Sequence, residues 1–353
     1  MILTIKPSQY DVVIGVDVDH KSYATTYFND EISNGRSLKM PAKPENMHSY
    51  FQKRFPGKRL LYAYEAGPTG YALHDYIVNQ GQSCIMVHPA GVPKAPNSRV
   101  KTNRLDSYKL AQEAKSGKLK GIRVPSEAYR ELRHLVNLRQ QYSQDRRATK
   151  QRIRALILFE NIQLPEALKP WTSSYRYALH QIPLKETLRF KLDLLLKDLD
   201  HARDRLLLMH RQIRKFSTHQ EAIAKNLNYL RSLPGIGIVV STYLLARIAD
   251  PAYLQNVREL GAFCGLVPSE NSTGDKIHKG AITHMGDSTL RSLLVEAAWI
   301  AIRKDKELGE FYYRIRAKGK GEAASRVAIV AVARKLTHRI YRVLKEQRPY
   351  VIC

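Results

Sequence analysis

Short apolar runs alternate with amphipathic stretches along the first 120 residues, and the two spacings predict different elements. Short runs rich in Val, Ile and Tyr are typical of buried strands, whereas apolar residues three and four positions apart indicate helices. This alternation predicts an α/β domain over residues 1–120. The predicted strands are Val12–Asp17, Tyr23–Phe28, Ser37–Met40, Leu60–Glu65 and Cys84–Val87, and the predicted helices are Pro44–Phe55, Gly70–Gln80 and Asn103–Ser116.

Acids stand at the ends of two of these strands and on the last helix. Asp17 and Glu65 each close an apolar run, and Asp106 lies three positions after Asn103, on the same face of the predicted helix. The order of strands and helices is that of a ribonuclease-H-like nuclease domain. Its chemistry needs carboxylates that converge on two divalent ions roughly 4 Å apart, and oxygen ligands suit Mg²⁺. Acids at strand ends also occur in α/β domains without a metal site, so the pattern alone leaves both interpretations open.

Long amphipathic helices replace the short strands after Gly121. One helix is predicted from Pro125, with Ser126 as its N-cap. Its arginine-rich polar faces are either exposed to solvent or in contact with phosphates, and the net charge of +26 favours phosphates. A second helix is predicted from about Leu184 to Arg214. Its apolar residues alternate four and three positions apart, which is the seam of a coiled coil that closes within the chain, between chains or both. The seam residues are Leu188, Leu192, Leu195, Leu199, Ala202, Leu206, Met209 and Ile213.

The remaining part of the chain, residues 229–353, is predicted to be mainly helical, with helices at Val239–Ile248 and Thr289–Ile302 and a final basic helix. The segment Leu233–Ile238 resembles the hairpin of helix-hairpin-helix modules. In such hairpins, glycines let backbone N–H groups approach a DNA phosphate. A helix-helix turn without function also favours Pro and Gly, so this signal is weak alone.

A turn-rich segment, Pro268–Thr283, carries the most reactive pattern in this part. It holds a hydroxyl pair, Ser272 and Thr273, beside a glycine and just before the cations Lys276 and Lys279. A serine in such a place can attack a phosphodiester while the cations stabilise the charge that develops on phosphorus. The alternative is a surface turn that at most binds a phosphate.

The charge of the chain limits the class of partner. With 58 Lys and Arg against 32 Asp and Glu, the net charge is +26, and such a surplus favours a polyanionic partner. Nucleic acid is the first candidate and an anionic membrane the second, although no apolar run approaches the roughly 20 residues of a membrane span. The N-terminus lacks the layout of a signal peptide, and the three scattered cysteines form no disulfide or zinc pattern. These features predict a protein of the reducing cytoplasm.

Four ordered stretches, spread over nearly the whole chain, resemble the transposases of the insertion-sequence 110/1111 family, which are related to the Piv invertases. Each stretch is a weak signal alone, but the ordered set is fairly specific. The stretches are Gly15-Val16-Asp17, Tyr64-Glu65-Ala66-Gly67, Lys101-Thr102-Asn103-Arg104-Leu105-Asp106, and the run from Leu266 through Ser272-Thr273-Gly274 and Gly280-Ala281-Ile282-Thr283 to Leu290-Arg291.

The resemblance implies three domains and a composite reaction. It implies a RuvC-like (ribonuclease-H-like) α/β domain at residues 1–120, a coiled-coil arm at 121–228 and a mainly helical transposase domain at 229–353. It also implies a prokaryotic recombinase that acts on donor and target DNA, is guided by a bridge RNA and assembles as a dimer of dimers with sites shared between subunits. By matching position, the metal-binding acids are Asp17, Glu65 and Asp106, and the nucleophile is Ser272, because the family has serine at the first of the two hydroxyl positions.

One position departs from the family pattern. Asn103 stands where the family most often has a further aspartate, so the expected Mg²⁺ set is Asp17, Glu65, Asn103 and Asp106. An amide oxygen can bind a metal, but it brings no charge and cannot act as a base. The alternatives are that Asn103 still coordinates, that Asp19 compensates, or that the site is weakened.

Three hypotheses follow for the function. The first is an RNA-guided DNA recombinase that forms a phosphoserine link through Ser272. The second is a RuvC-type junction nuclease that uses water, and the third is an RNA- or DNA-binding protein without chemistry. For contacts with the nucleic-acid backbone, we expect basic residues near the two motifs: Arg99, Lys101, Arg104, Lys276 and Lys279.

Overall fold

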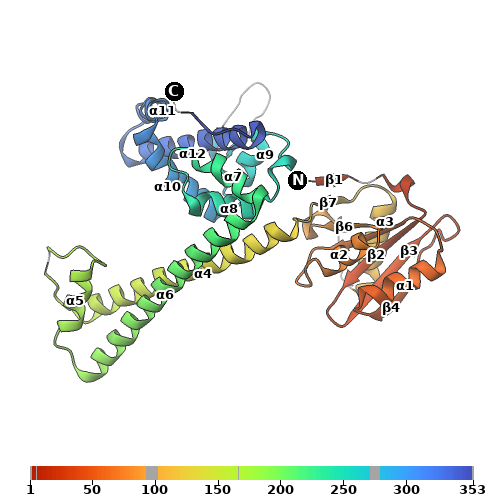
Figure 1. The fold of residues 1–353 in the computed structure, drawn as a ribbon, viewed down its shortest axis with the longest axis horizontal. Coiled ribbons are helices and arrows are strands. Elements are labelled where there is room, and N and C mark those ends of the chain that lie inside the picture. The colour runs from red at the N-terminus through yellow and green to blue at the C-terminus, as the bar shows by residue number, and fades with distance from the viewer. Residues whose placement is uncertain (1, 5, 93–101, 166, 271–278, 352–353) are drawn as a thin grey trace. The chain divides into compact units, whose positions relative to one another are not determined.

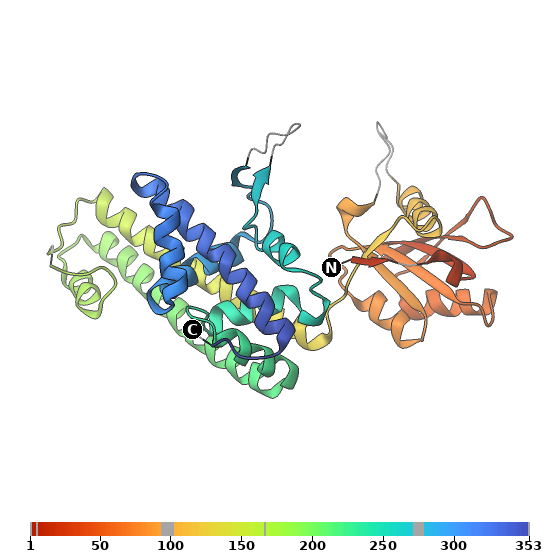
Figure 2. The ribbon, with the colours of Figure 1, turned by 90° about the horizontal axis from the view of Figure 1, so that it is seen from above.

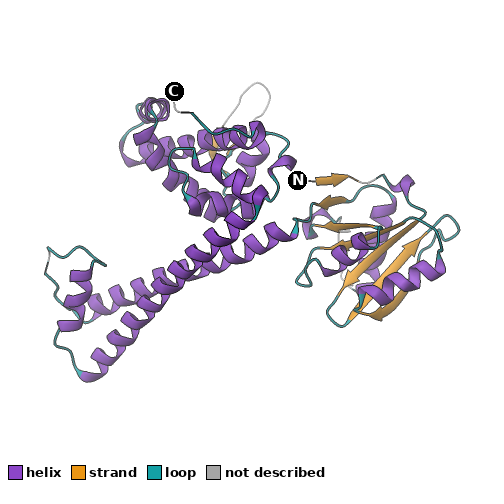
Figure 3. Cartoon of the chain, viewed as in Figure 1, coloured by secondary structure: helices purple, strands orange, loops and turns teal. Residues whose placement is uncertain are grey.

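The structure is a computed structural model that describes residues 2–4, 6–92, 102–165, 167–270 and 279–351. It forms two compact units, Met1–Val124 and Pro125–Cys353 (Figure 1). The first unit is built around a sheet and the second is almost entirely helical (Figure 3). Within the described residues, every helix is too short or too polar to span a membrane.

The first unit contains a seven-stranded mixed sheet in the order β1-β7-β6-β5-β2-β3-β4. Strands β2, β5 and β6 are parallel to one another, and the other pairs are antiparallel. The strands are β1 (Ile2–Thr4), β2 (Val12–Val18), β3 (Ser22–Phe28), β4 (Arg36–Pro41), β5 (Leu60–Glu65), β6 (Ser83–Val87) and β7 (Lys120–Ile122), and the α-helices are α1 (Pro44–Arg54), α2 (Ala72–Asn79) and α3 (Asn103–Lys115).

The predicted α/β arrangement is confirmed for this unit. All five predicted strands and all three predicted helices are present, although α2 begins at Ala72 rather than Gly70. The pattern missed β1 and β7, which have three residues each and pair with each other. A strand of that length is too short to show an alternation of apolar and polar side chains.

The two faces of the sheet carry separate apolar cores, because successive residues of a strand point to opposite faces. One core contains Ile14, Val16, Tyr62 and Tyr64, together with buried residues of α1 and α2. The other contains Val13, Leu61, Ala63 and Val87, together with Leu110 and Ala114 of α3. Helix α3 is therefore the helix that covers the second face.

Gly15 lets α3 lie unusually close to the sheet. A Cβ atom at this position would lie only 2.2 Å from the carbonyl oxygen of Ser107 and 2.4 Å from the backbone nitrogen of Ala111. Both of those atoms belong to the helix backbone, so no rotation of a side chain could relieve the overlap. The glycine thus sets the distance between β2 and the first half of α3.

The second unit consists of a long helical pair and a cluster of shorter helices (Figures 1 and 2). A short antiparallel hairpin of two strands interrupts the helices between α9 and α10. The elements are α4 (Glu127–Phe159), α5 (Ser173–Gln181), α6 (Glu186–His219), α7 (Glu221–Arg231), α8 (Ile238–Ile248), α9 (Val257–Phe263), β8 (Pro268–Glu270), β9 (Lys279–Ile282), α10 (Ser288–Lys304), α11 (Lys306–Arg316) and α12 (Gly321–Glu346).

The predicted apolar seam of α6 packs within the chain against α4. Six of its eight residues are buried, and Leu188 and Leu195 are partly buried against the same core. The structure adds Leu196, which the seam pattern omitted. Helix α5 supplies Tyr175 and Leu179 to this core, so the buried face of α6 is wider there than the contact of two helices requires. Ser126 occupies the N-cap position of α4, but its side chain makes no capping hydrogen bond.

Candidate functional site

Asp17 and Glu65 lie on the same face of the sheet, at the ends of two neighbouring parallel strands. The register pairs Val16 with Tyr64, and each acid is the next residue along its strand. Since Ala63 and Val87 belong to the core under α3, and Val87 is the cross-strand partner of Glu65, both acids face the side of α3. Neighbouring strands are roughly 4.8 Å apart, so this register brings the two carboxylates beside each other.

The first turn of α3 lies at the same end of the sheet. Along β2, Val13 shares a core with Leu110 and Ala114, and Gly15 lies against Ser107 and Ala111. Each step of two residues along the strand thus moves the contact by about one turn toward the start of α3. The next inward position is Asp17, which this progression brings to the first turn, where Asn103 and Asp106 are placed.

A chain of hydroxyl groups fixes this end of α3. The side chain of Thr102 caps the helix by accepting the N–H of Leu105 at 3.3 Å. The buried hydroxyl of Ser107 lies 2.9 Å from that of Thr26, which in turn lies 2.8 Å from that of Ser37. Sequence reasoning missed this chain. The sequence shows Thr26 as a hydroxyl residue within a predicted strand. Its pairing with Gly15, which turns it toward the core, is seen only in the structure.

The acids form an open arrangement. Among the described residues, no three side chains of His, Cys, Asp or Glu are placed to hold one metal ion. Asp17, Glu65 and Asp106 with the Asn103 amide nevertheless offer only oxygen atoms, and a hard divalent cation prefers such donors. The donors therefore fit such an ion in their chemistry, from one end of the sheet, without forming a closed cage.

Asp19, the residue considered as a substitute for the missing aspartate, lies beyond the end of β2 and is exposed. Its carboxylate accepts the backbone N–H of His20 at 2.7 Å and lies 2.9 Å from the ring nitrogen of His20. These contacts with His20 lower the pKa of Asp19. The residue is thus engaged in its own turn.

Residues 271–278, which contain Ser272 and are called the serine segment below, connect the two strands of the hairpin in the second unit. Ser272, Thr273 and Lys276 lie outside the described residues, but β8 and β9 on either side of them pair antiparallel. The hydroxyl of Ser269 donates to the carbonyl of Ala281 at 3.0 Å, and this bond adds to the ladder. The hairpin therefore brings the two ends of the serine segment together.

The base of this hairpin is tied to two helices. Arg291 of α10 donates to the carbonyl groups of Gly265 and Met285, at 3.4 and 3.2 Å. Gly265 has a φ of +66°, and a Cβ there would lie 2.2 Å from both Arg291 Nη1 and the Met285 oxygen. Asp287 caps α10 through the N–H of Leu290, and it also accepts the Tyr243 hydroxyl of α8 and forms an ion pair with Arg247.

The predicted backbone-binding cations are described only in part. Arg104 is exposed in the first turn of α3, on the residue after Asn103. Lys279 begins β9. Arg99 and Lys101 lie outside the described residues, as Lys276 does. The role of all five in binding nucleic acid stays a prediction.

Comparison with known proteins matches two parts of the chain to transposase families. Residues 14–160 match the DEDD_Tnp_IS110 transposase family, and residues 227–313 match the Transposase IS116/IS110/IS902 family. The first match contains Asp17, Glu65, Asn103 and Asp106, and the second contains Ser272. Both candidate sites therefore lie in regions that these families share.

Two of the named relatives match most of the chain, and a third matches less than half of it. The transposase for insertion sequence element IS1533 of Leptospira borgpetersenii is 24% identical over 356 residues, which cover 96% of this chain and 97% of that relative. A Sinorhizobium fredii protein named as transposase y4qE is 29% identical over 82% of this chain and 77% of its own length. The pilin gene-inverting protein of Moraxella bovis is 28% identical over 152 residues, 42% of this chain and 46% of that protein.

Proposed function

The chain belongs to the IS110 group of transposases, which cut and rejoin DNA, and from this premise we propose that Ser272 is its nucleophile and that Asp17, Glu65, Asn103 and Asp106 bind the divalent metal ion. The observation that carries the proposal is the placement of Asp17 and Glu65. They lie side by side near the ends of neighbouring parallel strands, on the face of the sheet that α3 covers. Carboxylates gathered at one end of a sheet suit metal-assisted phosphoryl transfer.

The proposed reaction exchanges one phosphoester bond for another. The Ser272 oxygen attacks a DNA phosphorus, the hydroxyl proton goes to a base, and the bond from phosphorus to the leaving sugar oxygen breaks as that oxygen takes up a proton. The product is DNA joined to the protein as a phosphoserine ester. Attack of a sugar hydroxyl of the other DNA on this ester restores the serine, so strand exchange requires no external energy source.

The oxygen donors of the first unit have a supporting role in this scheme. A bound Mg²⁺ would supply charge stabilisation at the phosphate, and Asp17 and Glu65 would hold it with Asn103 and Asp106. Asn103 contributes a neutral oxygen, so this donor set binds the ion more weakly than four carboxylates would. Arg104, Lys279, Arg99, Lys101 and Lys276 would hold the DNA backbone, and losing one should weaken binding without changing sequence choice.

The remaining parts of the proposal rest on the family resemblance and on the charge of +26. We propose that a bridge RNA selects the donor and target DNA and that the protein acts as a dimer of dimers in the prokaryotic cytoplasm. The division into a RuvC-like domain (1–120), a coiled-coil arm (121–228) and a transposase domain (229–353) belongs to the same proposal. The packing of α4 on α6 supports the arm.

The test is to trap the covalent intermediate. The protein is incubated with Mg²⁺, RNA transcribed from the sequence flanking its gene, and labelled donor and target DNA, and is then denatured. We expect label that migrates with the protein, that disappears with Ser272→Ala, and that persists with the matched control Thr273→Val. Label retained by Ser272→Ala would refute the serine assignment.

Because Asn103 replaces an aspartate of the family pattern, the same assay also distinguishes two other functions. Cut DNA without an adduct would identify a RuvC-type junction nuclease that uses water. Salt-sensitive binding of RNA or DNA, without any cut in Mg²⁺ or Mn²⁺, would identify a binding protein. In the second case, activity gained by Asn103→Asp would locate the defect at the metal site.

A further inference from the structure

A cavity of about 440 Å³ lies in the second unit, where α4, the start of α5 and α6 meet. Its wall combines cations with apolar side chains. Of the apolar side chains, Leu207 is 46% exposed, so part of the apolar wall is open to a ligand. The lining residues are Arg139, Arg146, Lys150, Trp171, Thr172, Ser173, Arg176, Leu199, Arg203, Leu206, Leu207 and His210.

The charge of this cavity is strongly one-sided. Five of its lining residues are Lys or Arg, and none of the described lining residues is an acid. One of the five, Arg176, is neutralised from outside the lining by Asp200, whose two oxygens lie 2.5 Å from Arg176 Nη2. The Nε atom of Arg176 is buried and lacks a hydrogen-bond partner among the described residues. The cavity thus concentrates positive charge that an anion could neutralise.

The cations of the cavity oppose one another's charge. Burial lowers the pKa of Lys150, and the neighbouring Arg146 and Arg154 lower it further. Burial and then Arg146 also lower the pKa of Arg139. His210 has a lowered pKa for the same reasons, with burial first and Arg139 next. A bound anion would remove this mutual repulsion.

The cavity is also built to hold its groups in place. Trp171 has a φ of +70°, and the Lys150 ammonium lies 4.8 Å from the centre of its ring. The Thr172 side chain caps α5 by accepting the N–H of Tyr175 at 3.3 Å. The N–H groups at the start of a helix have no partner within the helix and favour anions, and Ser173 brings this first turn to the cavity wall.

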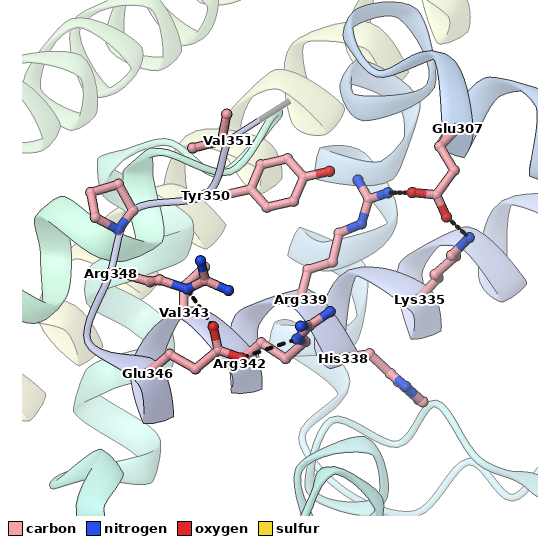
Figure 4. A pocket seen from close by; sticks show the side chains of 11 residues that line it. Glu307, Lys335, His338, Arg339, Arg342, Val343, Glu346, Arg348, Tyr350 and Val351 are labelled. Atoms are coloured by element: carbon pink, nitrogen blue, oxygen red, sulfur yellow. Dashed lines mark hydrogen bonds and ion pairs between the residues drawn. The ribbon is translucent and has the colours of Figure 1, made fainter. Parts of the chain in front are cut away.

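A second, larger cavity shows the opposite arrangement. It measures about 520 Å³ and lies beside the end of α12, and its acids pair with its cations (Figure 4). Glu307 binds Lys335 and Arg339, and Glu346 binds Arg342 at 3.2 Å and Arg348 at 2.5 Å. Beneath them, the buried Arg339 also pairs with the buried Asp305 at 2.5 Å, and that carboxylate accepts the Tyr350 hydroxyl at 2.9 Å. These cations already have partners, so this cavity is a stabilising network.

We propose that the cavity between α4, α5 and α6 binds a backbone phosphate of single-stranded nucleic acid. The cations and the first turn of α5 suit the phosphate, and the apolar wall around Leu207 suits the sugar or base beside it. In a duplex the bases are stacked inside, whereas a single strand presents them next to its phosphates. The inference deepens the proposed function and rests on it, because it assigns a place on the protein to an unpaired strand.

The test compares two double variants of the full-length protein. Arg146→Glu with Arg203→Glu reverses two exposed charges of the cavity, and Arg147→Glu with Arg211→Glu makes the same change on the same helices outside it. The probe is a labelled single-stranded oligouridylate, with single-stranded DNA and duplex DNA as parallel probes. We expect the cavity variant to bind single strands at least about tenfold more weakly and to lower the salt slope by about 1 more than the control does.

Each outcome has one meaning. Equal losses in the two variants would show a general effect of charge and overturn the proposal. A loss confined to duplex DNA would overturn the choice of a single strand. A larger loss for RNA than for single-stranded DNA, or an equal loss for both, supports the cavity and identifies its preferred strand. The assay for the covalent adduct tests Ser272 separately. Binding of a single strand at the cavity without any adduct would refute the proposed function but support the cavity as a binding site.

A second readout does not depend on charge reversal. Replacing Trp299 with Phe leaves Trp171 as the single tryptophan, because the chain contains two. We expect its emission to change on titration with the oligouridylate, with the same midpoint as the binding curve. Unchanged emission at saturation would place the strand elsewhere and overturn the proposal.

Discussion

Replacing Gly15 with Ala should separate α3 from the sheet. The added Cβ would lie 2.2 Å from the Ser107 carbonyl oxygen, about 1.2 Å short of the 3.4 Å of an ordinary contact. The second obstacle, the Ala111 nitrogen at 2.4 Å, is in the same helix, so one movement of α3 by more than 1 Å is the simplest relief. That movement would carry Asn103 and Asp106 away from Asp17.

The cost can be bounded from known overpacked cores. Extra atoms in a packed core cost about 1–3 kcal/mol, and here both obstacles are backbone, so we expect about 3 kcal/mol. For a unit of this size, each kcal/mol lowers the melting temperature by about 4 °C, which gives a fall of about 12 °C. The shift at the proposed metal-binding residues should reduce DNA cleavage by more than the loss of folded protein explains.

The assay is thermal unfolding of the full chain, combined with hydrogen exchange of the α3 amides and with cleavage measured well below the melting temperature. Gly67→Ala is the matched control, because it lies two residues after Glu65 and its Cβ would come no closer than 3.9 Å to another atom. A Gly15→Ala protein with unchanged α3 exchange and unchanged cleavage would refute the reasoning. So would an equal effect of Gly67→Ala.

Other predictions concern the proposed metal site and the buried ion pair of Asp305 with Arg339. Asn103→Asp adds a carboxylate and should lower the Mg²⁺ concentration for half-maximal cleavage by about tenfold, and an unchanged value would exclude Asn103 from the site. Arg339→Met leaves the buried Asp305 without its cation and should cost about 3–5 kcal/mol in urea unfolding. The exposed Arg342→Met should cost less than about 1 kcal/mol, and similar costs for the two variants would contradict this reasoning. Burial opposes the ionisation of Asp305, but hydrogen bonds from a backbone N–H, Arg339 and a tyrosine hydroxyl outweigh it and lower its pKa. The stabilisation of the folded state by ionised Asp305 should be complete above about pH 4 and should disappear as the pH falls through the lowered pKa. In Asp305→Asn, the melting temperature should therefore fall less steeply at acid pH than in the unchanged protein.

The sequence predicted the parts of the fold that local patterns determine. The strand that ends in Glu65 was predicted with its observed bounds, because five buried residues precede one exposed acid. The register that places Glu65 beside Asp17 could not be predicted, since it depends on strand pairing over nearly 50 residues of intervening chain. The close approach of α3 to Gly15 could not be predicted either, since α3 begins at Asn103, far from Gly15 in the sequence.

The second unit shows the same limit. The α6 seam was found by its spacing, but Leu196 was missed because α5, whose packing no local spacing indicates, widens the buried face. Three of the cavity cations, Arg139, Arg146 and Lys150, lie on the helix whose polar faces the sequence shows to be rich in arginine. Their convergence with Arg203 and Trp171 requires the return of the chain through α5 and α6. Chemistry near Ser272 was suggested by residue types, whereas the anchoring of its hairpin by Arg291 and Asp287 became visible only in three dimensions.

The direction in which the proposed metal-binding acids point depends on an even spacing within β2 and β5. Asp17 faces α3 because it lies two positions from Gly15, and Glu65 does so because it lies two positions from Ala63. Extra residues in the loops leave this spacing unchanged, since the strands can pair as before. One extra codon inside either strand would turn its acid toward the apolar core beneath α1 and α2. A change in loop length should therefore leave both acids on this face, whereas a one-residue insertion before the acid in either strand should remove that acid from the proposed site.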